Sequence, residues 1–199
     1  MSAQSGHALP GTRELRETAR LMVNTGDGKG KSTAAFGLAL RAWAQGWSVG
    51  VYQFVKSSSW RTGEREAFAA LDELHRTTGR GGPVAWHVLG AGRTALRVTR
   101  DTDQAALARA GWQVVREDLA RATHRLLVLD EFAHVLARGW VDPGEALAVF
   151  AGRPGLQHLL VTGRDCPRSV LDAADLATDM TKVAHPFDRG LRGLAGLEW

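Results

Sequence analysis

The sequence predicts an α/β protein with one mostly parallel sheet and helices on both faces. Three observations support this. Short apolar segments alternate with helical segments along most of the 199 residues, as in folds whose helices connect parallel strands. The apolar run at 125–132 (RLLVLDEF) is bounded by charge, which is typical of a strand buried on both faces. A glycine-rich segment at 25–33 (TGDGKGKST) stands where an expected strand gives way to an expected helix.

The length suits one buried domain, and we expect it to span residues 21–185. Residues 1–20 are expected to form a mobile N-terminal tail and a short helix over 12–20, with Thr12 as its N-cap. Residues 186–199 are glycine-interrupted and are expected to form a C-terminal surface tail.

The first half of the domain begins with an apolar strand over 21–24. The helix over 32–45 has apolar side chains at a helical period, and Gly46 ends it. The β-rich segment 48–55 (SVGVYQFV) predicts a second strand, which a helix over 62–77 follows.

The second half continues the alternation. A strand over 84–89 (VAWHVL) and a long helix over 101–123 precede the apolar strand at 125–132, and a helix over 142–152 has Pro143 in its first turn. A strand over 158–162, a helix over 169–174 and a final strand over 180–184 complete the domain.

Composition and charge exclude several classes of protein. Apolar residues make up 44% of the chain, but no run approaches the ~20 residues that span a bilayer, so we expect no membrane partner. The start of the chain lacks the pattern of a signal peptide. The single cysteine, Cys166, excludes an internal disulfide and suits the cytoplasm. The net charge of +4 is scattered among acidic residues, so no nucleic-acid partner is expected.

The segment 25–33 has the spacing of a P-loop that binds the phosphates of a nucleotide, although Thr25 stands where the first glycine usually stands. We expect its glycines to adopt positive φ and turn amides toward the phosphates. Lys31, expected at the surface of the loop, supplies a positive charge, and Ser32 can ligate Mg²⁺. The alternative is a glycine-rich turn with incidental lysines, which the flanking strand and helix disfavour. The nucleotide-binding residues are then Thr25, Gly26, Asp27, Gly28, Lys29, Gly30, Lys31, Ser32 and Thr33.

Asp130 and Glu131 close the apolar strand and predict the metal half of the same site. A parallel sheet delivers the carboxyl ends of its strands to one edge, so one carboxylate can hold Mg²⁺ (or Mn²⁺) beside Ser32. The alternative is a helix N-cap that follows a strand.

With these motifs in place, the chain resembles the ATP:corrinoid adenosyltransferases of cobalamin biosynthesis along nearly its full length. The most specific stretch combines TGDGKGKST with the QFVK motif at 53–56. The other matching stretches are VLDEF (128–132), GWV (139–141), VTGR (161–164), ADLATDMTKV (174–183), HPFD (185–188) and the closing GLEW (196–199).

The resemblance implies a RecA-like P-loop fold, a homodimer and an electron-donating reductase as partner. It also implies transfer of the 5′-deoxyadenosyl group of ATP to a Co(I) corrinoid, with release of triphosphate. Lys31 and Glu131 then fall on catalytic positions, and Arg41 and Arg164 on nucleotide-binding positions. Lys56, Trp60, Arg93 and Ala95 fall at the corrinoid pocket.

One segment departs from the family pattern. Relatives carry aromatic side chains in a G-x-G-[FW]-[ST]-W motif, whereas residues 90–95 read GAGRTA, so Arg93 and Ala95 replace both aromatics. Two alternatives to adenosyl transfer therefore stay open. One is a nucleotide- or corrinoid-binding homologue without transferase activity, and the weaker one is a P-loop ATPase or phosphotransferase.

The remaining histidines and the cysteine suggest no second site. No His-x-x-x-His or Cys-plus-His pairing occurs, so the sequence predicts no structural zinc. We expect His134 at the surface, Cys166 without a role, and Trp60 as the tryptophan that contacts a ligand.

Overall fold

The computed structural model describes residues 17–57, 62–90 and 101–197, with the side chains of residues 56, 57 and 101–103 left undescribed. The strands are β1 (Leu21–Thr25), β2 (Val49–Ser57), β3 (Val84–Gly90), β4 (Leu126–Asp130), β5 (His158–Thr162) and β6 (Leu176–Asp179). The helices are α2 (Lys31–Ala44), α3 (Gly63–Thr78), α4 (Asp101–Ala120), α5 (Phe132–Ala137), α6 (Pro143–Gly152), α7 (Arg168–Ala173) and a 3₁₀ turn, η2 (Pro186–Arg189).

The strands form one sheet in the order β3-β2-β4-β5-β1-β6, and every neighbouring pair is parallel. All carboxyl ends therefore meet at one edge, where a ligand site is expected in such folds. Strand β5 lies between β1, which leads into the glycine-rich loop, and β4, which ends at Asp130. The expected class, an α/β fold with a parallel sheet, is confirmed.

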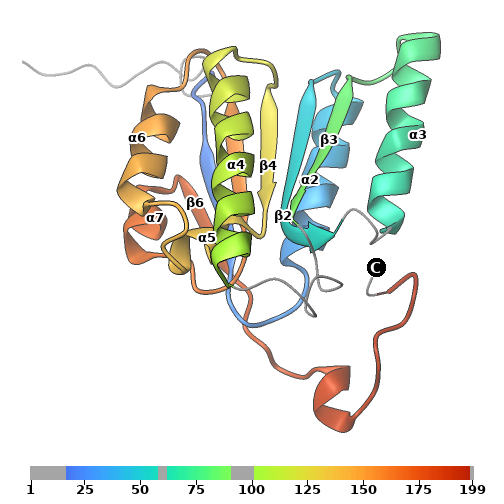
Figure 1. Cartoon of the computed structure of the whole chain (residues 1–199). Coiled ribbons are helices and arrows are strands. Elements are labelled where there is room, and N and C mark those ends of the chain that lie inside the picture. Colours follow the sequence, from blue (N-terminus) through green and yellow to red (C-terminus); the bar gives the residue numbers. More distant parts are fainter. Residues whose placement is uncertain (1–16, 58–61, 91–100, 198–199) are drawn as a thin grey trace, which may run out of the picture.

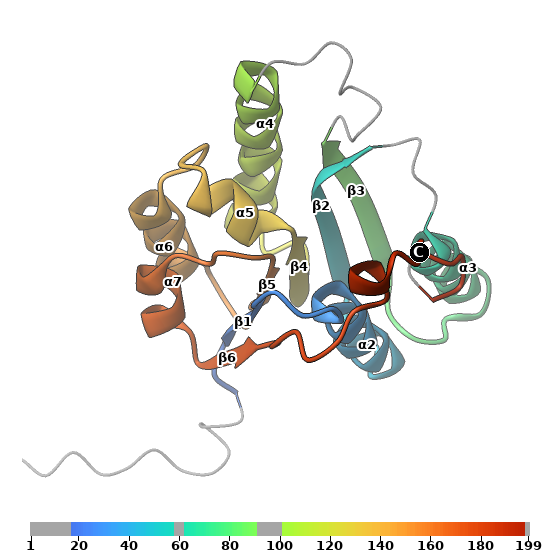
Figure 2. The same cartoon turned by 90° about the horizontal axis from the view of Figure 1, so that it is seen from below.

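Helices cover both faces of the sheet (Figures 1 and 2). Helices α2 and α3 pack on one face through a cluster that includes Phe36, Phe68 and Val128. Helices α4 to α7 pack on the other through a larger cluster that includes Trp112 and Phe132. Buried apolar area of this kind is the main source of stability in such a layered fold.

Alternation along the strands decides which polar side chains share a face. In β4, Leu126 and Val128 face α2 while Leu127 and Leu129 face α4, so Asp130 falls on the α2 face. In the neighbouring strands β2 and β5, Gln53 and Thr162 lie an even number of residues from apolar side chains that face α2. Their side chains therefore point to the α2 face as well. Three polar side chains therefore converge beneath the start of α2.

Strand β4 is shorter than expected, because the strand predicted to Phe132 ends at Asp130. Glu131 adopts a left-handed φ of 63° and caps α5, a helix that the sequence did not predict. The final strand predicted at 180–184 is also wrong, because β6 occupies Leu176–Asp179. All four residues of β6 are exposed at the sheet edge, so no burial pattern marked them.

The ends of the described chain differ from the core. Residues 17–20 form a turn and irregular chain rather than the end of a helix, and the rest of the expected tail and helix lies outside the described residues. Beyond β6, the chain forms an exposed arm with η2 at its lowest point in Figure 1. Within the described residues, no helix is both long enough and apolar enough to cross a bilayer.

Candidate functional site

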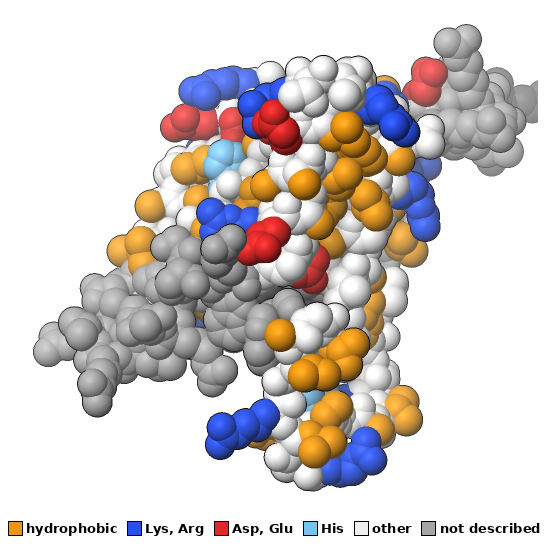
Figure 3. All heavy atoms as spheres, turned by 90° about the vertical axis from the view of Figure 1, so that its right-hand side faces the viewer, with side chains coloured by type: hydrophobic (Ala, Val, Ile, Leu, Met, Phe, Trp, Pro, Cys, Tyr) orange, Lys and Arg blue, Asp and Glu red, His pale blue; other side chains and the backbone are white. Residues whose placement is uncertain are grey.

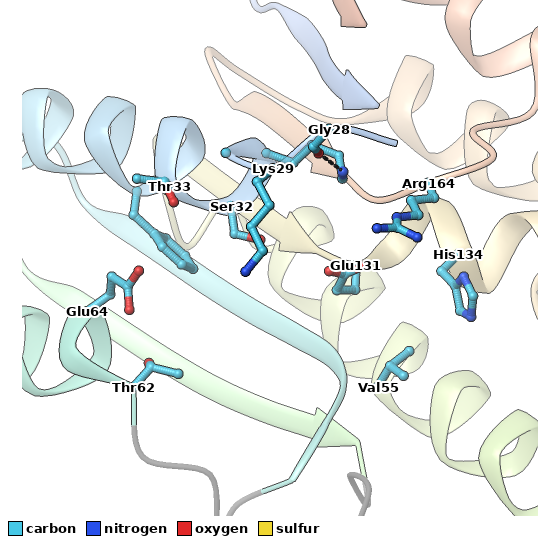
Figure 4. A pocket seen from close by; sticks show the side chains of 13 residues that line it. Gly28, Lys29, Ser32, Thr33, Val55, Thr62, Glu64, Glu131, His134 and Arg164 are labelled. Atoms are coloured by element: carbon cyan, nitrogen blue, oxygen red, sulfur yellow. Dashed lines mark hydrogen bonds between the residues drawn. The ribbon is translucent and has the colours of Figure 1, made fainter. Parts of the chain in front are cut away.

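A cavity of about 370 Å³ lies at the carboxyl edge of the sheet, beside the start of α2 (Figure 4). Its walls come from the glycine-rich loop, α2, the end of β2, the start of α3 and the segments that follow β4 and β5. The residues that surround it are Gly28, Lys29, Gly30, Lys31, Ser32, Thr33, Phe36, Val55, Thr62, Glu64, Glu131, His134 and Arg164.

Two glycines of the loop adopt the conformation that the sequence suggested. Gly26 has a φ of 94° and Gly30 a φ of 108°, both in the region that side chains disfavour. Gly28 does not have a positive φ, which corrects the expectation for this residue. Its amide donates to the Met180 carbonyl at 2.5 Å, and a Cβ here would collide with the backbone after β6. Close approach of two chain segments therefore requires Gly28.

Lys31 is buried, not at the loop surface as expected, with 8% of the residue exposed. Its ammonium donates to the carbonyls of Gly26 and Gly28, both at 2.6 Å, and so closes the loop on itself. Burial, followed by the positive charge of Arg164, lowers the pKa of Lys31, whereas Glu131 and other carboxylates oppose that shift. The two carbonyls that accept from the ammonium carry no net charge. A phosphate bound in the loop would give the ammonium an anionic partner.

The start of α2 supplies further donors. The amides of Lys31, Ser32 and Thr33 belong to the first turn, where helical geometry offers no intrahelical acceptor. No acidic side chain occupies that turn. The positive end of the helix dipole and these amides favour an anion in the cavity.

Asp130 is fully buried at the base of the site. Its Oδ1 accepts from Ser32 Oγ at 2.6 Å and from Thr162 Oγ1 at 2.8 Å, and its Oδ2 accepts from Gln53 Nε2 at 3.1 Å. The Gln53 amide is held in turn by Trp86 Nε1 at 2.9 Å. These oxygens fit the preference of Mg²⁺ for hydroxyl and carboxylate ligands.

Glu131, His134 and Arg164 line the wall that faces the loop (Figure 4). Arg164 Nη2 lies 3.4 Å from the Asp27 carbonyl, which places this arginine against the glycine-rich loop. His134 accepts from Arg138 Nε at 2.8 Å, and burial with the nearby Arg138 charge lowers its pKa. His134, expected at the surface, therefore faces the site in its neutral form.

The opposite wall comes from residues that the sequence did not single out. Thr62 caps α3 and accepts from Arg65 N at 3.3 Å, and Glu64 lies in the first turn of the same helix. Val55 adopts a left-handed φ of 64°, at an irregularity in the pairing of β2 with β3. Such a conformation is strained for a β-branched residue and is typical of functional sites.

Gln53 and Thr162 were also missed. The signal was present, because each is a polar residue inside an apolar strand, at the end where ligand sites form. What the sequence could not show was that β2 and β5 are the two neighbours of β4.

Among the described site predictions, Arg41 is not brought into this cavity. Arg41 lies ten residues along α2 from Lys31, about 15 Å away, and lines a separate apolar cavity with Trp47 and His158. Within a single chain it does not reach the phosphate loop. Trp60, Arg93, Ala95 and the side chain of Lys56 lie outside what the structure describes.

The site places the cysteine and Thr25 in supporting positions. Thr25 is buried at the end of β1, where its Oγ1 accepts from the Cys166 amide at 3.5 Å. Burial raises the pKa of the Cys166 thiol to about 11, so it is not a thiolate at neutral pH.

The fold and the glycine-rich loop define a P-loop protein, with that loop at the carboxyl edge of a parallel sheet. Residues 17–199 match the family described as ATP:corrinoid adenosyltransferase BtuR/CobO/CobP, and the chain belongs to that family of enzymes. Membership implies ATP and a corrinoid as substrates.

Two relatives named as corrinoid adenosyltransferases agree with this assignment. The chain is 38% identical over 179 residues to a corrinoid adenosyltransferase of Pseudomonas aeruginosa, covering 90% of this chain and 83% of that protein. It is 37% identical to the corrinoid adenosyltransferase CobA of Salmonella typhimurium, covering 90% and 85%. Among solved structures, the flagellar accessory protein FlaH from Methanocaldococcus jannaschii aligns with a TM-score of 0.47 at 15% identity, covering 82% of this chain and 71% of that chain.

Proposed function

We propose that this protein transfers the 5′-deoxyadenosyl group of ATP to a Co(I) corrinoid and releases triphosphate. The observation that carries the proposal is the buried Lys31 ammonium, which the glycine-rich loop encloses. The helix that follows this loop, α2, presents the backbone amides of its first turn to the cavity. Membership of the family supplies the second substrate.

In the proposed reaction, Co(I) supplies an electron pair to C5′ of ATP. The Co–C bond forms as the C5′–O bond breaks, cobalt is formally oxidised to Co(III), and triphosphate leaves with the electron pair of the broken bond. The protein therefore needs no side-chain base. Its contribution is to hold the nucleotide and to stabilise charge on the departing triphosphate, the role we assign to Lys31, Arg164 and the amides of α2.

Ser32, Asp130 and Glu131 are the residues we propose to hold Mg²⁺ (or Mn²⁺). The bound ion would neutralise phosphate charge. Thr162 and Gln53 hold the Asp130 carboxylate at the base of the cavity, and Glu131 lines its wall. The left-handed conformation of Glu131 turns the chain from β4 into α5 beside the phosphate loop.

The corrinoid would enter from the side of the cavity that Val55 and Thr62 border. These residues flank the segment 56–61, where the resemblance assigns Lys56 and Trp60 to the substrate. Arg93 and Ala95, which replace aromatics of the family, motivate the alternative of a binding protein without transferase activity.

We also propose a homodimer in which the C-terminal arm packs on the partner copy. The arm exposes large apolar side chains that are costly to leave in water: Val183 is 95% exposed, Phe187 77% and Leu197 81%. Figure 3 shows hydrophobic side chains at the lower end of the molecule, where this arm lies. We propose residues 21–185 as the domain, with residues 1–20 and 186–199 as the tails outside it.

A Co(I) substrate requires a reducing compartment and an electron donor, so we propose a cytoplasmic protein that works with a reductase. The single, half-buried Cys166 thiol is compatible with that compartment.

The test is anaerobic incubation with ATP, Mg²⁺ and chemically reduced cobalamin. We expect the light-sensitive spectrum of a Co–C bond to appear, and Lys31→Ala to prevent it. If ATP binds but no Co–C bond forms, the binding-protein alternative replaces the proposal.

A further inference from the structure

Three side chains from separate elements meet beneath α4, away from the nucleotide cavity. His87 comes from β3, Asp118 from α4 and His124 from the connection between α4 and β4. One potential ligand atom from each lies within 4.8 Å of the other two. Helix α4 covers the face of the sheet opposite α2 (Figure 2), so this cluster and the Ser32–Asp130 pair lie on different faces.

His124 has an unsatisfied ring nitrogen. The residue is 8% exposed, and its Nδ1 is among the few buried side-chain atoms of the described chain that lack a hydrogen-bond partner. The ring packs so closely on β2 that a side chain at Gly50 would collide with it. A buried polar atom without a partner costs free energy, and an ion is one explanation for it.

The other members of the cluster are held in place. Asp118 Oδ2 accepts from Tyr52 Oη at 2.6 Å, and Oδ1 accepts from Thr123 Oγ1 at 3.3 Å. The Tyr52 ring stacks on His87, with centroids 4.8 Å apart and planes 9° apart. A carboxylate with two such donors still has lone pairs for a cation, and donors of this kind orient the ligands of metal sites.

We infer that His87, Asp118 and His124 bind one divalent first-row transition-metal ion, and that Zn²⁺ fits this set best. Two imidazoles and one carboxylate are typical zinc ligands, and water would complete four-fold coordination. With metal–ligand distances of about 2.0–2.2 Å, the three atoms, which lie within 4.8 Å of one another, would close in to about 3.4 Å.

Such a metal would tie β3 to the C-terminal half of α4. The inference does not depend on the proposed transferase activity.

The test uses chelator-treated full-length protein in excess Mg²⁺. The Mg²⁺ is added to saturate the proposed site at Ser32 and Asp130, and it competes only weakly for imidazole ligands. We expect calorimetry to show one equivalent of Zn²⁺ bound, and Co²⁺ in its place to give the visible bands of tetrahedral coordination. A hundredfold excess of Zn²⁺ over its Kd should raise Tm by roughly 5 to 10 °C.

Matched variants decide the assignment. His87→Ala and Asp118→Asn should abolish the Co²⁺ bands, whereas His185→Ala, a histidine in the C-terminal arm, should leave them unchanged. Tyr52→Phe keeps the ring but removes the donor to Asp118, so it should weaken binding by about 10- to 100-fold. Circular dichroism verifies that each apo variant is folded. Absence of the bound equivalent in Mg²⁺, or bands that survive in folded His87→Ala and Asp118→Asn, would overturn the inference.

Discussion

Lys31 combines two roles, since its ammonium closes the loop now and would contact phosphate when ATP binds. We predict that Lys31→Ala weakens ATP binding by roughly 100-fold, because a hydrogen bond from a charged donor is lost. It should also lower the free energy of unfolding by about 1 kcal/mol, because two carbonyls lose their donor.

Lys29→Ala is the matched control, because Lys29 lines the same cavity but is exposed. Calorimetry with ATP and urea unfolding measure both effects. Equal losses of stability in the two variants would show that the carbonyl contacts of Lys31 do not stabilise the loop.

The Thr162 hydroxyl joins the Asp130 carboxylate to the backbone of Glu131. It donates a hydrogen bond to Asp130 and accepts one from the Glu131 amide at 3.0 Å. Thr162→Val has nearly the same shape but lacks the hydroxyl, so it leaves two buried groups short of a partner. We predict a loss of about 1 to 3 kcal/mol in the free energy of unfolding. Thr178→Val, on the exposed strand β6, should change stability by less than about 0.5 kcal/mol. Urea unfolding compares them, and equal effects would contradict the role of Thr162.

At the scale of elements, the phosphate loop depends on the segment that follows β6. Gly28→Ala would push a Cβ into the carbonyls of Met180 and Thr181, so we predict weaker ATP binding and a loss of roughly 1 to 3 kcal/mol in stability. Gly37→Ala, in the interior of α2 with open space around it, should instead stabilise by about 0.5 to 1 kcal/mol. Thermal melts and ATP titration measure both. A harmless Gly28→Ala would show that this contact is not required.

His158 links β5 to the start of β1, because its Nδ1 accepts from the Arg20 amide at 3.2 Å. Burial, together with the positive charges of Arg125, Arg153 and Arg20, lowers its pKa below the usual 6.5, whereas Asp175 opposes the shift. The folded state therefore favours the neutral ring. Its contribution to stability is present above about pH 6.5 and is lost as the pH falls through the lowered pKa.

We predict that the wild-type protein loses more stability than His158→Gln between pH 7.5 and pH 5.5, because glutamine keeps an acceptor but does not titrate. Urea unfolding at the two pH values gives the comparison. The same loss in both proteins would assign the pH dependence to other groups.

Local sequence predicted those elements that have a motif or a clear apolar pattern of their own. The glycine spacing of residues 25–30 identified the phosphate loop, and the charged end of an apolar run identified Asp130. Residues 176–179 and helix α5 were missed because exposed edge strands and short helices lack a clear apolar period.

For the whole molecule, what sequence could not provide was the order of strands. The Asp130 network needs β2, β4 and β5 as neighbours, and the His87–Asp118–His124 cluster needs β3 beside α4; neither follows from spacing along the chain. The absence of a local histidine motif therefore did not exclude a cluster assembled by the fold. The convergence of strand ends at one edge was predictable, and the cavity beside the glycine-rich loop lies at that edge.

In the proposed reaction, the fold holds three linked phosphates while C5′ is attacked, so the fate of those phosphates tests the proposal most directly. After anaerobic reaction with ATP, Mg²⁺ and reduced cobalamin, phosphorus NMR of the products measures what leaves. We predict one intact triphosphate for each Co–C bond formed. ADP and phosphate, without a Co–C bond, would contradict the proposed transfer and identify a hydrolase instead.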